Sequence, residues 1–134
     1  MELRQELLKE ASDLVQVSWE RGADATATNA AGDVVWSPTK QQGFMRFSGL
    51  EPNNPAQNQY QLWIFDEAQD ARYPIDGGVF NIPASAGPAG EIIVPITAKL
   101  PVSKVTLFAV TIEKPGGVVV SSRERLPLLA KVTK

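Results

Sequence analysis

The chain has 134 residues, ten glycines, ten prolines and a formal net charge of −2, and it contains neither cysteine nor histidine. This length fits one domain with a sizeable core. The missing residue types exclude disulfides, thiolate chemistry, His-based catalytic triads and most zinc sites. The charge excludes the broad basic field of a nucleic-acid binder, so no nucleic-acid partner is expected. No signal peptide or apolar run of membrane-spanning length is recognisable, so we expect either a cytosolic protein or an excised piece of a larger one.

The N-terminal stretch Glu2–Ala11 is the one segment with helical periodicity. Leu3, Leu7 and Ala11 repeat at four-residue spacing and Leu8 widens the apolar stripe. Such a short helix is marginal alone in water, so its stripe is expected to pack on the domain or on a second copy of the chain. The alternatives are a membrane-proximal stalk and a partner-binding helix.

Short apolar or alternating runs separated by turn residues follow the helix, a pattern typical of strands. We expect strands at residues 14–19, 34–37, 43–50, 60–66, 77–82, 91–96, 105–113, 118–120 and 126–132. The small residues Ala25–Ala31 form a candidate edge strand. Tyr60–Asp66 is expected to be the buried central strand, paired antiparallel with Gly43–Leu50. Lys114–Gly117 is expected to turn the strand before it back into Val118–Val120 as a hairpin.

Eight to ten short strands predict an all-β protein, an antiparallel β-sandwich, immunoglobulin-like or related, with one short N-terminal helix. We place the helix in residues 1–12 and the sandwich in residues 13–134. Adjacent core residues must point to opposite faces of a strand. Much of the core is expected from Trp36, Phe47, Leu62, Trp63, Ile64, Phe80, Leu107, Phe108 and Val110.

Three groups of polar residues are candidates for chemical sites. Ser37 and Lys40 have the S-x-x-K spacing of penicillin-recognising enzymes, but no K-T-G motif accompanies them and a simple turn is favoured. The acidic cluster of Asp66, Glu67, Asp70 and Asp76 has no EF-hand spacing, so a solvated loop is favoured over a calcium site. Glu113 ends a strand before a Pro-Gly-Gly turn, and we expect its carboxylate to accept hydrogen bonds from the turn amides.

Nothing in the sequence assembles a nucleophile with a base, so we expect no enzyme, no catalytic residue, no metal site and no cofactor. A rival hypothesis is a free-standing carbohydrate- or peptide-binding sandwich module. Sugar binders need a flat exposed aromatic ring, and the candidates are Trp19, Trp36 and Tyr73.

Several short motifs recur in an order that resembles one known family. They are Trp36-Ser37-Pro38, Gly43 to Leu50, Tyr60-Gln61-Leu62-Trp63, Gly77-Gly78-Val79-Phe80, and Val110-Thr111-Ile112-Glu113-Lys114-Pro115-Gly116-Gly117. Together they resemble the C-terminal domain of anti-sigma-K factors, over roughly Leu14 to Ala130. On this resemblance, the family-motif residues with structural roles are Trp36, Tyr60, Leu62, Trp63, Gly78, Phe80, Thr111, Glu113, Gly116 and Gly117.

The resemblance implies a membrane-bound regulator of an extracytoplasmic-function sigma factor, and hence of transcription. It implies a cytosolic domain that binds the sigma factor, one transmembrane helix, and this domain outside the membrane as a sensory or regulatory part. A membrane protease would be a further partner, since signalling in the family is tied to proteolysis. The helix at residues 1–12 would then be a juxtamembrane stalk, with a homodimer through it as a further prospect.

Overall fold

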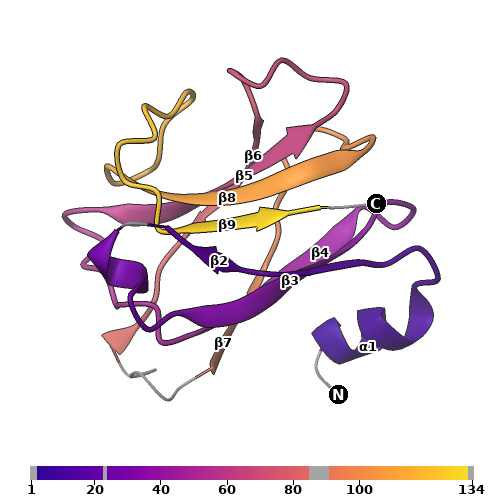
Figure 1. Ribbon diagram of the computed structural model, residues 1–134, viewed down its shortest axis with the longest axis horizontal. Coiled ribbons are helices and arrows are strands. Elements are labelled where there is room, and N and C mark those ends of the chain that lie inside the picture. The colour runs from indigo at the N-terminus through magenta and orange to yellow at the C-terminus, as the bar shows by residue number, and fades with distance from the viewer. Residues whose placement is uncertain (1–2, 23, 85–90, 133–134) are drawn as a thin grey trace.

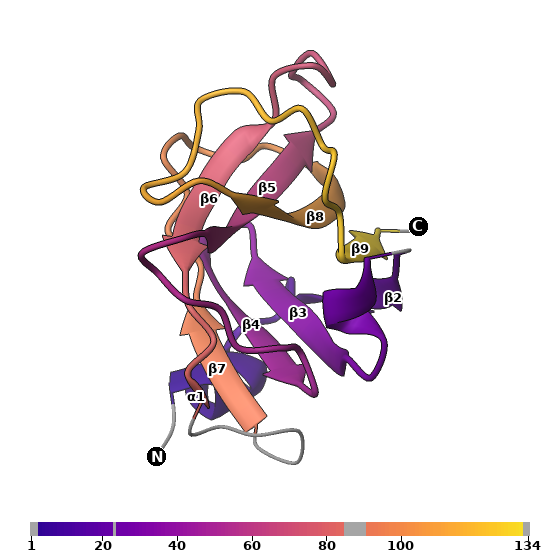
Figure 2. The ribbon, with the colours of Figure 1, turned by 90° about the vertical axis from the view of Figure 1, so that its left-hand side faces the viewer.

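The computed structural model describes residues 3–22, 24–84 and 91–132. It is an all-β sandwich of two antiparallel sheets with one short helix (Figure 1; Figure 2). The helices are α1 (Leu3–Glu10) and the short 3₁₀-helix η1 (Ala25–Ala27). The strands are β1 (Val15–Ser18), β2 (Glu20–Arg21), β3 (Ala31–Ser37), β4 (Gln42–Ser48), β5 (Gln59–Asp66), β6 (Ile75–Phe80), β7 (Glu91–Pro95), β8 (Val105–Glu113) and β9 (Leu128–Lys131). In this part of the chain, no helix has the length and hydropathy needed to cross a membrane.

The chain passes from one sheet to the other at several points along its length. The four-stranded sheet has the order β1-β3-β4-β7 and the five-stranded sheet the order β2-β9-β8-β5-β6. The chain changes sheets between β1 and β2, at Trp19, whose amide donates to the Gly32 carbonyl at 3.1 Å. After β7, the amide of Thr97 donates to the Gly77 carbonyl of β6 at 2.9 Å. The first contact continues the pairing of β1 with β3, and the second covers a carbonyl of the edge strand β6 that would otherwise lie open.

Strand positions agree well with the sequence, but one expected pairing is wrong. β5 is a central strand, as predicted, yet its neighbours are β6 and β8, whereas β4 pairs with β3 and β7 in the other sheet. The connection of residues 49–58 carries the chain between the sheets. Tight hairpins use loops of about two to five residues, so this longer connection is free to change sheets.

Two further expected strands are absent from the described chain. Within Ala25–Ala31, the first three residues form η1, because Asp24 caps it by accepting a hydrogen bond from the Thr26 amide at 3.0 Å. Val118–Val120 forms no hairpin with β8. Both sides of β8 are already occupied, by β5 and by β9, so no position is left for a third strand.

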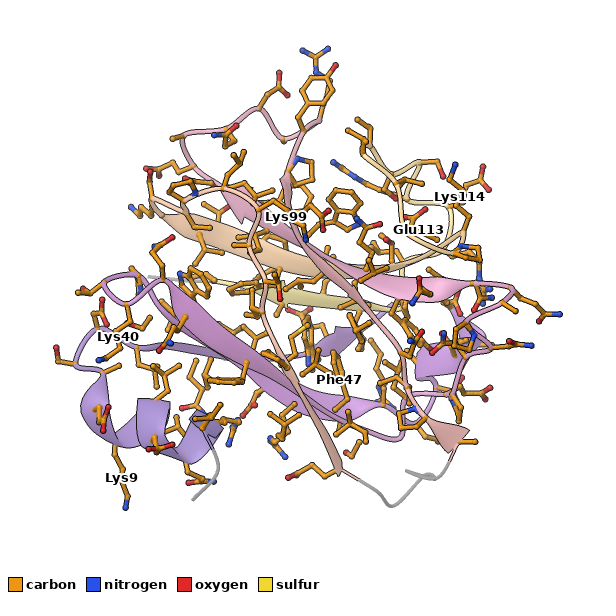
Figure 3. The ribbon with its side chains drawn as sticks, turned by 180° about the vertical axis from the view of Figure 1, so that it is seen from behind. Lys9, Lys40, Phe47, Lys99, Glu113 and Lys114 are labelled. Atoms are coloured by element: carbon orange, nitrogen blue, oxygen red, sulfur yellow. The ribbon has the colours of Figure 1, made fainter. Side chains whose placement is uncertain are left out.

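An aromatic stack runs through the space between the sheets. The rings of Trp19, Phe47, Phe80 and Tyr60 follow one another with centroids 5.4, 5.3 and 5.6 Å apart. Figure 3 shows Phe47 in the middle of the molecule, between the two layers. Since these rings come from both sheets and from the crossing at Trp19, the stack joins the two layers.

The outer face of each sheet is also covered. Leu7 and Val35 are buried where α1 lies against the four-stranded sheet. Trp63 is buried as well, but it lies outside the inter-sheet core cluster, on the outer face of the five-stranded sheet. The expected core is otherwise buried, with Leu107 only half-buried.

Candidate functional site

The family-motif residues named from the sequence divide into two groups in space. Trp36, Tyr60, Leu62 and Phe80 lie between the sheets as core. Trp63, Thr111, Glu113, Gly116 and Gly117 gather on the outer face of the five-stranded sheet, at the start of a long segment without strands, residues 114–127. We call this segment the lid, and Figure 2 shows it arching over β5, β6 and β8. The remaining residue, Gly78, lies in the edge strand β6 at a φ of +108°, and its amide donates to Asp76.

Two glutamines of β5 attach the first half of the lid to the sheet. Gln61 is buried; its Oε1 accepts from the Val118 amide at 3.0 Å and its Nε2 donates to the Val118 carbonyl at 3.1 Å. Gln59 Oε1 accepts from the Gly116 amide at 2.8 Å. The Gln61 side chain thus pairs with the Val118 peptide as a neighbouring strand would, and leaves neither polar atom unsatisfied.

The two glycines of the turn allow this close approach. Gly116 and Gly117 have φ of +88° and +78°, in the left-handed region that favours glycine. A Cβ at Gly117 would lie 2.7 Å from Gln61 Oε1, whereas one at Gly116 would meet nothing within 4 Å. Gly117 is therefore required for contact as well as for conformation, and Gly116 for conformation alone.

Trp63 and Thr111 form a buried polar pair beside the glutamines. Trp63 Nε1 donates to Thr111 Oγ1 at 2.8 Å, and both side chains are almost fully buried. The Thr111 hydroxyl therefore gives the buried indole N–H of Trp63 a hydrogen-bond partner.

Glu113 does not have the role expected from the sequence. The turn amides of Gly116 and Val118 donate to Gln59 and Gln61, while the Glu113 carboxylate accepts from the Ser121 hydroxyl farther along the lid. The Glu113 carboxylate, at the end of β8, is bound to Ser121 in the middle of the lid. The turn amides are bound instead by the two glutamines of the neighbouring strand β5. Glu113 remains a structural residue that fixes the lid.

The second half of the lid is held by two arginines. Arg123 Nη2 donates to the Ala71 carbonyl at 2.6 Å, and its guanidinium lies 4.9 Å from the centroid of the Phe65 ring. Arg125 binds Asp24 through two nitrogens at 2.9 and 3.0 Å. The hydrogen bonds from Arg125 lower the pKa of Asp24 to about 2. The lid is thus fixed along its whole length although it contains no strand.

An open groove of about 380 Å³ lies between the lid and the β5–β6 loop. It is lined by Arg72, Tyr73, Val120, Ser121, Ser122 and Arg123. Arg72 pairs with Asp70 at 2.9 Å in an exposed salt bridge. A groove of similar size, lined by residues 96–101 and Gln41, lies beside the end of β7.

A cluster of charged residues fixes α1 to the four-stranded sheet. Arg4 is buried and its Nη2 donates to both carboxylate oxygens of Asp33, at 2.9 and 3.0 Å. Arg46 also binds Asp33, and extends to Glu91 at 2.9 Å. Burial raises the pKa of Asp33, but hydrogen bonds from Arg46, Gln16 and Arg4 outweigh it and hold the pKa below its usual value. The charges are therefore compensated, although the Arg4 Nε has no hydrogen-bond partner among the described residues.

The other polar candidates named from the sequence make structural contacts. Ser37 Oγ donates to Asp13 at 2.9 Å and accepts from the Lys40 amide, as in a turn. Asp66 is buried, contrary to the solvated loop expected, and accepts from three backbone amides, those of Ala68, Ser103 and Lys104. No three acidic side chains in the described ranges lie close enough to hold a metal ion.

The exposed aromatic platform of a sugar binder is mostly missing. Trp19 and Trp36 are buried, and of the three candidates only Tyr73 is exposed, at 55%. Trp36 belongs to the core, as predicted, and Trp19 is buried at the crossing between sheets, so neither gives the rival carbohydrate hypothesis a platform.

Sequence reasoning missed Gln59, Gln61, Arg4, Asp33 and the lid arginines. For Gln61 a signal was present, since a glutamine inside an apolar strand needs a buried polar partner. For Arg4, the leucine stripe was misleading: Leu3 is 66% exposed, whereas Arg4 and Leu7 face the sheet. The partners of these residues lie far away in the sequence, so no local sequence pattern predicts these contacts.

Comparison with protein families gives one match. The model of the family described as anti-sigma-K factor rskA, C-terminal, matches residues 3–122. The match begins at α1 and ends within the lid, before β9. Searches of curated proteins and of solved structures found no match. Since the family match spans most of the chain, including both groups of motif residues, the chain belongs to the anti-sigma-K factor rskA C-terminal family.

Proposed function

We propose that this chain is the extracytoplasmic regulatory domain of a single-pass membrane anti-sigma factor, and that it controls release of an extracytoplasmic-function sigma factor. Family membership carries the proposal, because it gives the chain a part in anti-sigma regulation and hence in transcription control. The sigma factor itself binds a cytosolic domain elsewhere in the protein. The chain is not an enzyme and responds by binding and conformation.

The docking of α1 supports a regulatory role. Helix α1 is too short to be stable alone, so its order depends on Leu7 and on the Arg4–Asp33 pair. Residues 11–14 are all that separates it from β1. A membrane anchor upstream of α1 would therefore be coupled directly to the sandwich, and release of α1 would change what a membrane protease can reach. In this proposal α1 acts within its own chain, and pairing of two copies through α1 is a secondary prospect because Leu3 is its one strongly exposed leucine.

A reporter assay tests this coupling in the full-length protein. Arg4→Glu places a carboxylate against Asp33 and should release α1, raising sigma-dependent transcription and shortening the lifetime of the anti-sigma factor on immunoblots. Lys9→Glu, at an exposed position of the same helix, is the matched control and should leave both unchanged. Unchanged output from Arg4→Glu, with α1 shown to be released, would contradict the proposal.

A pulldown tests the division of labour between domains. The isolated chain should retain no sigma factor, because that task belongs to the cytosolic domain. Retention of a sigma factor by residues 1–134 alone would overturn this assignment. The full-length gene product should carry an apolar run of about 20 residues upstream of this chain.

The alternative is a free-standing binding module. The buried tryptophans remove most of the support for a carbohydrate site, whereas the groove beside the lid is compatible with a peptide. Saturable quenching of tryptophan fluorescence in a glycan screen would favour the carbohydrate module over the regulatory domain.

A further inference from the structure

Exposed apolar side chains gather at the end of the molecule away from α1. Of the six large apolar side chains exposed in the described residues, three lie on the lid and the β5–β6 loop: Tyr73, Val119 and Val120. Tyr73 and Val120 line the same groove, and Val119 precedes Val120 in the chain. Val119 is 91% exposed, on a segment that is held at both ends. Figure 3 places Lys114, at the start of the lid, and Lys9, on α1, at opposite corners of the molecule.

The contacts of the lid explain why these side chains are exposed. Gln61 fixes Val118 just before them, and Arg123 is fixed just after them by the Ala71 carbonyl and the Phe65 ring. Arg123 has a φ of +60°, an uncommon conformation for a residue other than glycine. Backbone strain of this kind is concentrated at functional sites. These polar contacts thus hold two valines in water, where they contribute nothing to the core.

The groove beside these residues has a definite chemical character. Two guanidinium groups, those of Arg72 and Arg123, line it together with the Tyr73 ring and Val120, and no acidic side chain does. Arg123 forms no ion pair with any residue that the structure describes. The pair of Arg72 with Asp70 is exposed at both ends, and such pairs are weak enough to exchange for another carboxylate.

We propose that this groove binds an extended acidic peptide segment of a partner protein, with carboxylates at Arg72 and Arg123 and apolar side chains against Tyr73 and Val119–Val120. The groove is open, whereas small-molecule sites enclose most of their ligand, so a peptide is the better fit. The lid and the β5–β6 loop, which line the groove, lie at the end of the molecule away from α1 (Figure 1). A membrane to which the chain is anchored through α1 would therefore not reach the groove. The proposal rests on the proposed function for two points: the compartment in which the partner is met, and the place of the membrane relative to α1.

Peptide binding to the isolated chain tests the groove without membrane or sigma factor. The probes are two fluorescein-labelled decapeptides in which leucine alternates with glutamate or with lysine. Fluorescence anisotropy should show saturable binding of the glutamate peptide, weakened by added salt. Amide shifts in NMR spectra should be confined to residues 70–73 and 118–124. Equal binding of the lysine peptide, or shifts elsewhere on the domain, would overturn the proposal.

Substitutions locate the charges and the apolar contact. Arg123→Gln should weaken the glutamate peptide about five- to tenfold, whereas Arg21→Gln, a distant exposed arginine, should leave binding unchanged. Arg123 also holds the lid, so a second pair of variants avoids that contact. Val119→Lys should tighten binding of the glutamate peptide about two- to fivefold and Val119→Glu should weaken it by a similar factor. The same response from both variants would contradict a charge-selective groove.

A membrane surface is the competing occupant. Anionic lipid attracts basic segments of proteins, so the test uses vesicles of neutral lipid with about 30% anionic lipid. These vesicles should not bind the chain in a sedimentation assay. Vesicle binding that depends on Arg123 and Val119 would overturn the peptide proposal and leave the regulatory function standing. Peptide binding combined with sigma-factor retention in the pulldown would do the reverse.

Discussion

Gln61 shows how a single side chain can replace a strand. Its amide group exchanges two hydrogen bonds with the Val118 peptide, so the lid is attached to the sheet where no strand is available. The arrangement needs a residue without a Cβ at position 117. Gln61 and Gly117 therefore act as a pair, and their substitutions should not be additive.

A double-mutant cycle measures this coupling. Gln61→Ala should cost about 1–3 kcal/mol, because the half-buried amide and carbonyl of Val118 lose their partner. Gly117→Ala should cost about 1–3 kcal/mol from strain and from the clash with Gln61. In the double variant the clash is gone, so urea denaturation should give a total below the sum by about 1 kcal/mol.

Gly116→Ala is the matched control for the cycle. It has the same kind of positive φ, but a Cβ there meets nothing within 4 Å. Its cost should add to that of Gln61→Ala. Equal non-additivity at both glycines would show that the coupling comes from the turn conformation and not from contact with Gln61.

Trp63 is the largest buried side chain on the face of the five-stranded sheet that the lid covers. It is buried and its indole N–H is bound to Thr111. Trp63→Ala should cost about 3–5 kcal/mol on chemical denaturation, as expected for a large buried aromatic. Val119→Ala, at an exposed position, should change stability by less than about 0.5 kcal/mol. A loss under about 1 kcal/mol for Trp63→Ala would contradict its central position in β5.

At the scale of elements, most strands were predictable but their pairing was not. The alternation in β4 and the apolar run in β5 are local properties of the chain, and both strands lie where expected. Which strands pair depends on where the 49–58 connection leads, and no local pattern encodes that. The same reason explains the missing hairpin, since β9 takes the place beside β8 that Val118–Val120 was expected to fill.

Helix α1 illustrates the same limit. The sequence predicted the helix and its burial through leucines, but the buried contacts are Leu7 and Arg4. Arginine was assigned to the polar face because its partner, Asp33, lies 29 residues away. The candidate site was therefore only half predictable: motif residues could be named, but the ion cluster and the lid contacts depend on the tertiary fold.

The ion cluster gives an asymmetric prediction for the two partners. Asp33→Ala should cost about 3–5 kcal/mol, because it leaves the buried Arg4 charge without compensation. Arg4→Met should cost less, about 1–3 kcal/mol, since Asp33 keeps Arg46 and Gln16. Thermal and urea denaturation measure both. Equal losses of stability in the two variants would show that Arg46 and Gln16 do not compensate the charge of Asp33 when Arg4 is absent.

Deletion of residues 1–11 tests the element as a whole. The aromatic stack contains no residue of α1, so circular dichroism should still show a folded β-sandwich, with a lower melting temperature. The exposed apolar surface around Val35 should make the truncated chain more prone to associate. Loss of the β signal would show that α1 is needed for the fold.

At the scale of the whole molecule, the Asp24–Arg125 pair connects the two ends of the chain. The partners are 101 residues apart, and Asp24 also caps η1. They join the loop after β2 to the end of the lid, while β2 and β9 pair next to them. Loss of this contact would therefore loosen the lid from the sandwich without touching the aromatic stack.

The pH dependence of stability reports this contact. The pKa of Asp24 is lowered to about 2 in the folded chain, from an ordinary value of 3.8. A carboxylate with a lowered pKa stabilises the fold above its unfolded pKa, and that contribution is lost as the pH falls from about 4 toward 2. Because Arg125 is half-exposed, solvent screening reduces the effect to about 1–2 kcal/mol.

Urea denaturation at pH 6, 4 and 2.5 should show wild type losing more stability than Asp24→Asn over this range. Asp70→Asn is the control, because Asp70 is exposed and pairs only with its near neighbour Arg72, so its variant should follow the wild-type curve. Parallel curves for wild type and Asp24→Asn would place the acid sensitivity elsewhere, with Asp33 and its three partners as the next group to substitute.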